Sequence, residues 1–434
     1  MNAISPADTA WLLVSSALVL LMTPGLAFFY GGLVRAKNAL NTMMMSFVAM
    51  GAVGVAWAVA GYSLAFAGEG GFIGGLDHVF LRGVGLEAKG SVPHLLFMAY
   101  QGTFAIITAA LISGAIVERM RFGPYVAFIS AWVLLVYAPV CHWVWGGGWL
   151  ARMGALDFAG GTVVHVNAAA AALVAAWVLG PRKDYGRQAL LPHNVPFVLL
   201  GTALLWFGWF GFNGGSALGA NESAVLAFVN TMLAPAAALV VWTAVDWFRE
   251  RKATAVGGVT GIVVGLVAIT PAAGFVGPMA AILIGAVAVL PSYALILMRT
   301  RGRLDDSLDV VAAHGMGGVV GALLDDVILG FTIAEADADP AGRPLGVGLQ
   351  SAGIHAPVPH CGSHRVALRV LAHAADETRC LAKCLQVPGD IEGGPPEHAC
   401  AVRKMIEQHL TEDAKPLVAH PFCPISLKSI QSTV

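Results

Sequence analysis

The sequence has few charged residues, and this scarcity limits the class of protein it can encode. Only 12% of the 434 residues are Asp, Glu, Lys or Arg, whereas charged residues make up about a quarter of an ordinary soluble domain. The 25 basic and 26 acidic residues nearly cancel, so the chain has no basic field that would attract nucleic acid. Hydrophobic residues account for 57% of the chain. This composition excludes a water-soluble globule for most of the length and indicates a polytopic membrane protein.

Cysteine is nearly absent from residues 1–324 and common after them. The first 324 residues contain only Cys141. Residues 325–434 contain the other five of the six cysteines, seven of the thirteen histidines and ten of the 22 prolines. We therefore divide the chain into a membrane domain, residues 1–324, and an atypical Cys-, His- and Pro-rich tail, residues 325–434.

Apolar runs long enough to cross a bilayer recur through the membrane domain, separated by short polar breaks. A hydrocarbon core about 30 Å thick requires roughly 20 apolar residues per helix. The sequence therefore predicts an all-α domain with ten transmembrane helices. Their approximate bounds are residues 11–33, 41–66, 94–117, 124–146, 158–179, 193–214, 224–247, 254–272, 276–298 and 306–324.

Lysine and arginine gather in alternate breaks, and this asymmetry predicts the orientation of the chain. The breaks after the odd-numbered spans carry Arg35, Lys37, Arg119, Arg121, Arg182, Lys183, Arg187, Arg249, Arg251, Lys252, Arg299, Arg301 and Arg303. The remaining breaks carry only Arg82, Lys89 and Arg152. Basic loops stay in the cytoplasm, so we expect a multi-pass protein of the cell (plasma) inner membrane with its N-terminus outside.

A short aromatic and glycine motif recurs at an offset of five spans. It reads Phe28–Gly32 at the inner end of the first span and Phe212–Gly215 at the outer end of the sixth. An odd offset inverts the second half of the domain relative to the first, as in many transporters. The recurrence favours an inverted five-helix repeat.

Two histidines lie inside apolar spans, where ionisable groups are costly and usually functional. His165 lies about 11 Å from the outer end of its span, and His314 about 12 Å from the inner end of its own, at roughly 1.5 Å per residue. In a core about 30 Å thick they reach similar depths, so the two imidazoles could face each other and offer a polar edge to a small neutral molecule. The alternative is that each histidine only bonds a carbonyl of a neighbouring helix.

Several short motifs follow one another along the membrane domain. They are Thr23–Gly25 with Phe29–Gly32, Gln101–Phe104, His142–Gly148, Asp157–Asn167, Gly208–Ser216, and Asp305–Asp309 with His314-Gly315. In these motifs and in their order, residues 1–324 resemble the ammonium transporter (Amt) family. The resemblance implies the eleven-helix fold of that family, of which ten helices are recognisable here, and it implies transport of ammonium across the membrane.

The resemblance also implies particular site residues. Trp145, Phe104, Phe212 and Ser216 match an outer vestibule that recruits ammonium. Aromatic faces attract a partly desolvated cation by about 0.5–2 kcal/mol, and a serine hydroxyl can accept one of its N–H groups. Phe104 and Phe212 also resemble the stacked pair that closes the family's pore.

Passage of a bare ammonium ion through an apolar lumen would cost tens of kcal/mol by Born reasoning. The resemblance therefore implies that ammonium is deprotonated and conducted as ammonia past His165 and His314, which line the lumen. Asp157, three residues before Gly160-Gly161, fits a helix cap better than a cation ligand, so we expect it to support the site rather than to touch the substrate.

The resemblance implies a homotrimer with one pore per subunit and, where the family's usual tail is present, control by a PII-type signal protein. The atypical tail puts that last partner in doubt. We expect no cofactor and no metal in the membrane domain. We also do not expect an enzyme, since the spans hold no paired carboxylates, Ser-Lys pair or HExxH motif.

No run of about 18 apolar residues follows Leu324, so the sequence predicts that the family's eleventh span is missing. A frame change in the coding sequence would explain the shift in composition. The tail could instead bind metal through His360, Cys361, Cys380, Cys384, His398 and Cys400, although these lack regular CxxC pairs. A third explanation is a disordered tail, which its proline content permits. We assign the tail no chemistry.

Two alternatives to transport remain open on the sequence. The protein could be an ammonium sensor that binds its ligand with little flux. It could also be the non-conducting product of a truncated or frame-shifted gene, since a missing helix could prevent assembly.

Overall fold

The computed structural model describes residues 3–299, 302, 304–338 and 363–385. Helices dominate these residues, with two short strands, β1 (Ala88–Lys89) and β2 (Val92–Pro93), that form a small antiparallel hairpin. The α-helices are α1 (Pro6–Leu33), α2 (Ala36–Ala56), α3 (Tyr62–Phe66), α4 (His94–Ile116), α5 (Phe122–Trp132), α6 (Ala138–Trp145), α7 (Trp149–Arg152), α8 (Asn167–Leu179), α9 (Val195–Gly215), α10 (Glu222–Glu250), α11 (Ala255–Ile269), α12 (Pro278–Arg299), α13 (Gly317–Ala338) and α14 (Ser363–Leu385). The π-helices are η1 (Trp57–Gly61), η3 (Val133–Tyr137), η4 (Gly161–Val166) and η5 (Val311–Met316), and η2 (Val79–Leu81) is a 3₁₀ turn.

Nine helical rods in the described part of the chain are long and apolar enough to cross a membrane. They are Pro6–Leu33, Ala36–Phe66, His94–Ile116, Phe122–Arg152, Gly161–Leu179, Val195–Gly215, Glu222–Glu250, Pro278–Arg299 and Val311–Ile328. The span predicted at residues 254–272 forms α11, an apolar helix of 15 residues. It ends at Ile269, two residues before Pro271, which has no N–H to continue the helical hydrogen bonds. The protein is therefore a mostly helical, multi-pass membrane protein.

Two predicted spans begin later than expected because acidic turns precede them. The span predicted to begin at residue 306 begins instead at Val311, whose N–H donates to Asp306 Oδ2 at 2.7 Å. Asp309, at φ 58°, lies outside helical geometry. The span predicted at residue 158 begins at Gly161 in the same way. In these segments polar side chains bond the free amides of the first turn, which hydropathy does not detect.

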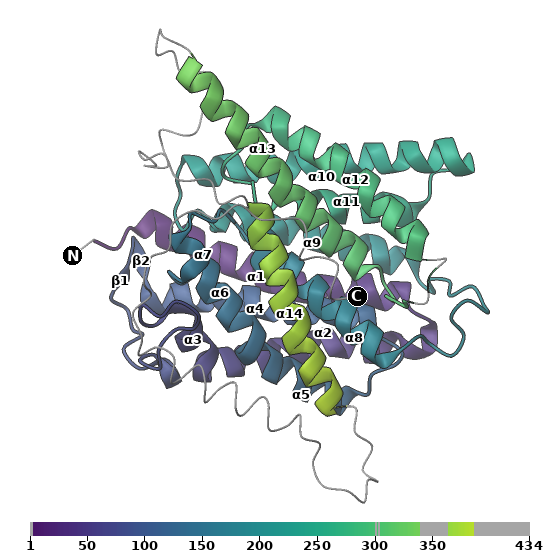
Figure 1. The fold of residues 1–434 in the computed structure, drawn as a ribbon, viewed down its shortest axis with the longest axis horizontal. Helices are drawn as coiled ribbons and strands as arrows, with labels where there is room; N and C mark the ends of the chain where they lie inside the picture. The colour runs from purple at the N-terminus through teal and green to yellow at the C-terminus, as the bar shows by residue number, and fades with distance from the viewer. Residues whose placement is uncertain (1–2, 300–301, 303, 339–362, 386–434) are drawn as a thin grey trace, which may run out of the picture. The chain divides into compact units, whose positions relative to one another are not determined.

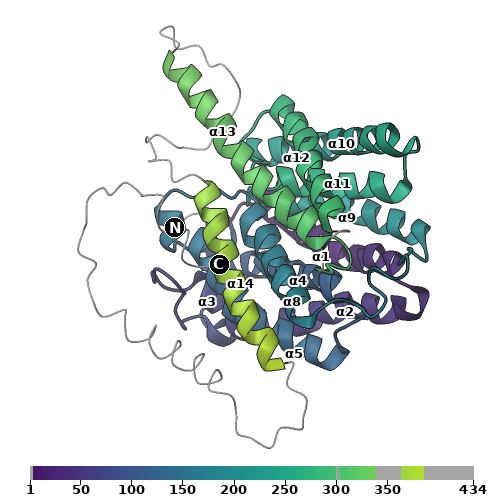
Figure 2. The ribbon, with the colours of Figure 1, turned by 45° about the vertical axis from the view of Figure 1, so that its right-hand side comes forward.

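The centre of the described domain is the contact between α1 and α9, the first and sixth spans (Figure 1). Glycines permit the close approach: a Cβ at Gly201 would collide with the backbone of Phe29 and Gly25. Small residues at helix crossings are a common device in membrane proteins. The helices α10, α11 and α12 form a second group that packs beside α9, and Figure 2 shows them together with α9 from another angle.

Beyond Leu324 the last span continues as α13 to Ala338, past the predicted end of the membrane domain. The next described helix, α14, packs against α8, α13 and α5 (Figures 1 and 2). It is amphipathic: Val370 and Ala374 are fully buried, and Thr378 accepts a hydrogen bond from Trp132 Nε1 at 3.0 Å. It is too polar to count among the nine candidate spans.

Most of the tail hypotheses fall outside the described residues. His360, Cys361, His398 and Cys400 all lie there, and Cys380 lies in α14, where it is exposed. Within residues 3–299, 302, 304–338 and 363–385, no group of three or more His, Cys, Asp or Glu side chains could hold a metal ion.

Candidate functional site

Two π-helices that occupy matching places in the two halves of the domain carry the buried histidines. His165 lies in η4, which opens the fifth span, and His314 lies in η5, which opens the tenth. A residue with positive φ comes shortly before each: Gly160 at 107° and Asp309 at 58°. π-helical turns are rare and frequently occur at functional sites. The pairing at an offset of five spans matches the predicted inverted repeat.

The structure brings the two imidazoles together. His165 Nδ1 lies 3.1 Å from His314 Nδ1, the ring centroids are 5.2 Å apart, and both side chains are buried. One neutral ring must donate its Nδ1–H while the other accepts, which leaves the two rings with different tautomers. The Nε2 atom of His165 has no hydrogen-bond partner among the described residues and can serve a small ligand.

Asp157 organises the start of η4. Its Oδ2 accepts hydrogen bonds from the N–H groups of Thr162 and Val163, both at 2.9 Å, and its Oδ1 accepts one from Gly160 at 3.0 Å. Burial raises the pKa of the carboxyl group to about 6, against the opposing effect of these amide bonds. Asp157 is therefore ionised at neutral pH and fixes the turn that carries His165.

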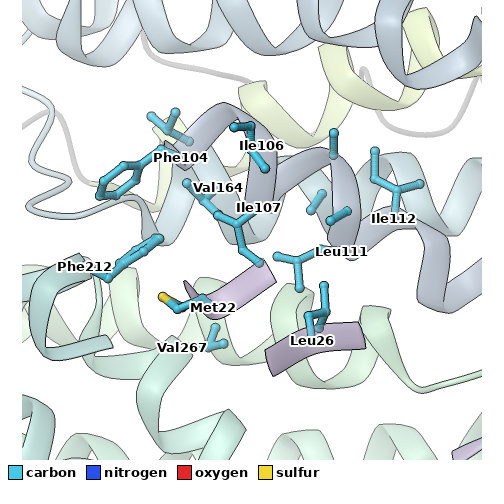
Figure 3. Packing of buried hydrophobic residues seen from close by; sticks show 14 of the residues in the cluster. Met22, Leu26, Phe104, Ile106, Ile107, Leu111, Ile112, Val164, Phe212 and Val267 are labelled. Carbon is cyan, nitrogen blue, oxygen red and sulfur yellow. The ribbon is translucent and has the colours of Figure 1, made fainter. Parts of the chain in front are cut away.

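Three aromatic rings close one end of the space above the histidines. The Phe104 and Phe212 rings lie 4.2 Å apart at 31°, and Trp145 packs edge-on against Phe104 at 5.8 Å. Figure 3 shows Phe104 and Phe212 side by side at one end of an apolar cluster that continues through Ile107 and Leu111. Phe104 and Phe212 are almost completely buried, whereas Trp145 is partly exposed. The two phenylalanines therefore form a closed constriction below a more open tryptophan.

Ser216, the remaining predicted vestibule residue, lies at the end of α9 and is partly exposed. Its hydroxyl donates to the Phe212 carbonyl at 2.8 Å and lies 3.3 Å from the Tyr100 hydroxyl. Trp145 is held by a hydrogen bond from its Nε1 to the Asp157 carbonyl oxygen at 2.8 Å. The entrance is thus tied to the same turn that positions His165.

Below the phenylalanines, a narrow cavity contains both histidines. Its other lining residues are Met22, Leu26, Phe29, Ile107, Leu111, Leu205, Trp209, Phe212 and Val263. The free space is about that of one water molecule. Apart from the imidazoles, and the indole of Trp209, the walls are aliphatic or phenyl groups. Such a passage suits a small neutral molecule and disfavours a solvated ion.

Sequence reasoning missed two residues that position the site. Trp209 stacks on His165 with centroids 5.3 Å apart and an angle of 18°. The Tyr100 hydroxyl donates to the Phe212 carbonyl at 3.0 Å. Trp209 falls within the motif Gly208–Ser216, which was the available signal, but an aromatic residue in an apolar span is usually part of the packing. Tyr100 directly precedes the motif Gln101–Phe104.

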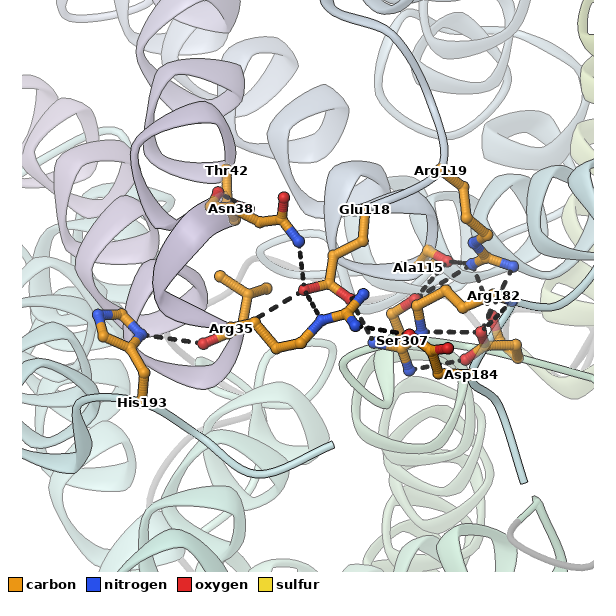
Figure 4. Close-up of polar contacts among 12 residues, drawn as sticks. Arg35, Asn38, Thr42, Ala115, Glu118, Arg119, Arg182, Asp184, His193 and Ser307 are labelled. Carbon is orange, nitrogen blue, oxygen red and sulfur yellow. Dashed lines mark hydrogen bonds and ion pairs between the residues drawn. The ribbon is translucent and has the colours of Figure 1, made fainter. Parts of the chain in front are cut away.

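Charged residues from four interhelical breaks meet at the end of the domain that carries the breaks after the odd-numbered spans (Figure 4). Arg35 pairs with Glu118 at 2.9 Å, and Arg182 pairs with both Glu118 at 3.3 Å and Asp305 at 2.8 Å. Arg119 donates to the Asp305 carbonyl at 2.6 Å. We refer to Arg35, Glu118, Arg119, Arg182 and Asp305 as the arginine cluster.

The arginine cluster ties the ends of the spans together. Burial raises the pKa of Glu118, but hydrogen bonds from Arg35 and Asn38 more than offset it, and the pKa lies at about 2. Buried ion pairs of this kind are costly to break, because one charge is then left uncompensated. An open cavity beside the cluster is lined by Arg35, Glu118, Arg182, Tyr185 and Arg299, among other residues.

The fold and the site together define a class: a multi-pass helical protein with a closed aromatic entrance and a narrow apolar passage lined by a histidine pair. The profile described as Ammonium Transporter Family matches residues 10–347. The chain belongs to the ammonium transporter family. The match continues past Leu324 and leaves residues after 347 outside it.

Curated proteins and solved structures agree with this assignment. The chain is 48% identical over 336 residues to an ammonium transporter of Bacillus subtilis, covering 76% of this chain and 83% of that protein. It is 49% identical over 356 residues to an ammonium transporter of Aquifex aeolicus, covering 81% and 84%. The crystal structure of Candida albicans Mep2 matches with a TM-score of 0.78 at 34% identity, covering 96% of this chain and 94% of that one. A structure named Sensor Amt Protein matches with a TM-score of 0.79 at 28% identity, covering 91% and 96%.

Proposed function

We propose that this protein transports ammonium by recruiting the cation at Trp145, Phe104, Phe212 and Ser216 and conducting it as neutral ammonia past His165 and His314. Membership of the ammonium transporter family supports the substrate. The observation that carries the mechanism is the contact between the two imidazoles at 3.1 Å inside a cavity with room for about one water molecule. Apart from the two imidazoles, such a lumen has too few polar groups to replace the hydration shell of an ion.

Each part of the proposed route has a separate physical role. The Trp145 face attracts the cation, and the Ser216 hydroxyl oxygen can accept one of its N–H groups. The Phe104 and Phe212 rings exclude water, so only the uncharged form proceeds. His165 Nε2 then offers a hydrogen bond to ammonia in the lumen, and Trp209 holds that ring in place. Asp157 keeps the turn before His165 fixed and does not touch the substrate.

We further propose that the chain acts as a homotrimer in the plasma membrane, with the N-terminus outside and the arginine cluster facing the cytoplasm. The basic residues of alternate breaks support this orientation. Four of these breaks contribute residues to one network at one end of the domain. We do not include a PII-type partner in the proposal, because the residues after 347 lie outside the match to the family.

Substitution of His165 tests the proposed passage. The full chain is reconstituted in liposomes, and uptake of radiolabelled methylammonium is compared with that of His165→Leu. Leucine removes both ring nitrogens and fills the lumen with an aliphatic group, so we expect uptake to fall at least tenfold, equivalent to about 1.4 kcal/mol or more. The control is His78→Leu, a histidine outside the lumen that bonds the Arg82 carbonyl. Equal uptake by both variants and the wild type would show that ammonia does not pass His165.

The likeness to the structure named Sensor Amt Protein supports a second candidate function. In that case the vestibule would bind ammonium while the closed phenylalanine pair prevents flux. Isothermal titration of ammonium in detergent, beside the uptake assay, separates the two. Tight binding with no uptake above empty liposomes would favour a sensor.

A further inference from the structure

Asp325 is a buried carboxyl group that the proposed passage does not use. It lies in α13 within the last candidate span, its exposed fraction is 0%, and neither of its oxygens has a hydrogen-bond partner among the described residues. The buried acids Glu118 and Asp305, by contrast, are paired with arginines. An ionisable residue inside a membrane domain with no partner is a candidate functional site. It also falls within the part of the chain that matches the family profile.

The packing of α13 brings Asp325 toward the turn that starts η4. At the crossing of the two elements, a Cβ on Gly318 would lie 2.8 Å from the Gly161 carbonyl oxygen. Asp325 lies about two helical turns beyond Gly318, and Asp157 lies just before Gly161. Residues seven apart lie on the same face of a helix, so Asp325 is on the face of α13 that packs against η4.

The two acids have opposite surroundings. Asp157 accepts three backbone N–H groups, all of which favour its charged form. Asp325 accepts no hydrogen bond from the described residues. Its complete burial disfavours a negative charge, and the acidic residues Asp326 and Asp157 disfavour it further. In an apolar interior, two neighbouring carboxyl groups with such different surroundings divide one proton unequally.

We propose that Asp325 is a proton-binding site within the membrane domain, and that Asp157 and Asp325 together hold one proton and one negative charge. The proton resides on Asp325 because the amides stabilise the charge on Asp157. A proton fits the site better than a metal or ammonium ion. Those ions require several ligands around them, whereas the described residues contain no cluster of three or more acidic, histidine or cysteine side chains.

Among the described side chains of the elements packed against α13, none donates a hydrogen bond to Asp325 or forms an ion pair with it. The helices α11 and η5 carry no Lys or Arg, and α12 carries Arg299 only at its far end. Helix α14 carries His373, Asp376, Glu377 and two described arginines. His373 packs on Trp143, Arg369 lies over the Trp149 ring and Arg379 over the Trp177 ring. Burial opposes the charged form of Asp325 most strongly, and the acids Asp326 and Asp157 oppose it as well. The proton is therefore the counter-charge.

The inference adds Asp325 to the residues of the proposed transport route. Only the role of Asp325 in transport rests on the proposed function. Conduction of neutral ammonia leaves behind one proton for each ammonium recruited. Asp325 lies in α13, which packs against η4, and Asp157 precedes η4 and bonds Trp145 at the proposed entrance. A carboxyl group in this region could take part in handling that proton. The binding of a proton by Asp325 can be measured whether or not the protein conducts.

Infrared difference spectroscopy of the full chain in lipid tests the proposal. A protonated carboxyl group has a carbonyl absorption that is separate from that of a carboxylate and shifts in deuterated water. We expect this band in the wild type at neutral pH and in the matched control Asp326→Asn, and we expect its loss in Asp325→Asn. If Asp325→Asn does not fold, Asp325→Glu keeps the carboxyl group and should shift the band without abolishing it.

Two further variants test the pair and separate it from transport. Asp157→Asn removes the repelling charge, so the band should disappear at a lower pH than in the wild type. In His165→Leu the band should persist, even though uptake is lost. A spectrum that is the same in the wild type and both Asp325 variants would overturn the proton site. A titration that Asp157→Asn leaves unchanged would overturn the pairing.

Discussion

Among single residues, Asp157 has the most far-reaching effect on the site. One side chain fixes the first turn of η4, and its backbone carbonyl holds the Trp145 indole. Asp157 thus contacts the entrance through its backbone carbonyl and the turn before His165 through its carboxylate. We therefore expect transport to depend on the protonation state of Asp157.

The pKa of about 6 at Asp157 predicts a pH dependence of uptake. As the external pH falls through about 6, the carboxylate takes up a proton, one oxygen becomes a donor, and the amide bonds of the first turn weaken. We expect methylammonium uptake by proteoliposomes to decrease about tenfold between about pH 8 and about pH 5, since nearly all Asp157 side chains are protonated a full unit below the pKa. Asp157→Asn should give low uptake that is flat over this range. Constant wild-type uptake would contradict the prediction.

Stability should respond to pH in the opposite direction. Folding raises the pKa of Asp157 above its ordinary value of 3.8, so the folded state holds more protons than the unfolded state between about pH 4 and about pH 6. The free energy of unfolding therefore decreases as the pH rises through this window. The negative charge of Asp157, which we expect transport to require, therefore lowers the free energy of unfolding.

At the residue scale, the sequence predicted those parts of the site that carry a recognisable motif. His165, His314, Phe104 and Phe212 come together in the structure. The roles of these residues remain proposals. The apolar lining of the passage could not be predicted, because a leucine that faces the lumen and a leucine that faces a neighbouring helix have the same hydropathy.

At the scale of elements, the close contact of α1 and α9 determines the spacing of the two halves. Gly201 has no room for a methyl group, because a Cβ there would collide with the Phe29 backbone. Phe29 itself lines the passage. Any separation of these two helices would therefore widen the lumen as well as weaken the packing.

We expect Gly201→Ala to lower the free energy of unfolding by about 1–3 kcal/mol, the usual effect of overpacking. Thermal unfolding in detergent, followed by tryptophan fluorescence, measures the change. The matched control is Gly51→Ala, since Gly51 lies in α2 with nothing within 4 Å of its added Cβ. The control should be neutral or slightly stabilising, because alanine favours a helix over glycine. Equal melting temperatures for the two variants would rule out a tight crossing at Gly201.

Most helices could be predicted from the sequence, because an uninterrupted run of about 20 apolar residues indicates a membrane-spanning helix. Their ends were less predictable. The acidic turn Asp305–Asp309 reads as the start of a helix, yet Asp306 bonds the Val311 amide instead and delays it. Helix α14 has no long apolar run. The residues that it buries, Val370 and Ala374, are one helical turn apart, and a pattern of two residues is too short to predict a helix from the sequence.

For the whole molecule, the decisive property is assembly. The described residues include nine candidate spans and the short helix α11, and the amphipathic α14 lies where it covers α8 and α13. The family resemblance implies a homotrimer, and we expect this arrangement of helices to form one. A failed assembly would instead support the non-conducting gene product.

We expect native mass spectrometry of the detergent-purified full chain to give a trimer. Thr378→Leu, which removes the acceptor of the Trp132 hydrogen bond, should lower thermal stability by about 0.5–1.5 kcal/mol and leave the stoichiometry unchanged. Ser130→Ala is the control, because its hydroxyl bonds only within its own helix. Purified protein that is solely monomeric or aggregated would contradict the proposed assembly.

The small volume of the passage also predicts how well it distinguishes ammonia from methylamine. A space that accommodates one water molecule admits one ammonia molecule, but an added methyl group requires Phe104 and Phe212 to move apart. The ratio of ammonia to methylamine permeation is therefore a measure of how far those rings yield. A large ratio would indicate that the Phe104 and Phe212 rings are rigid. A ratio near one would indicate that the rings move apart each time a molecule passes.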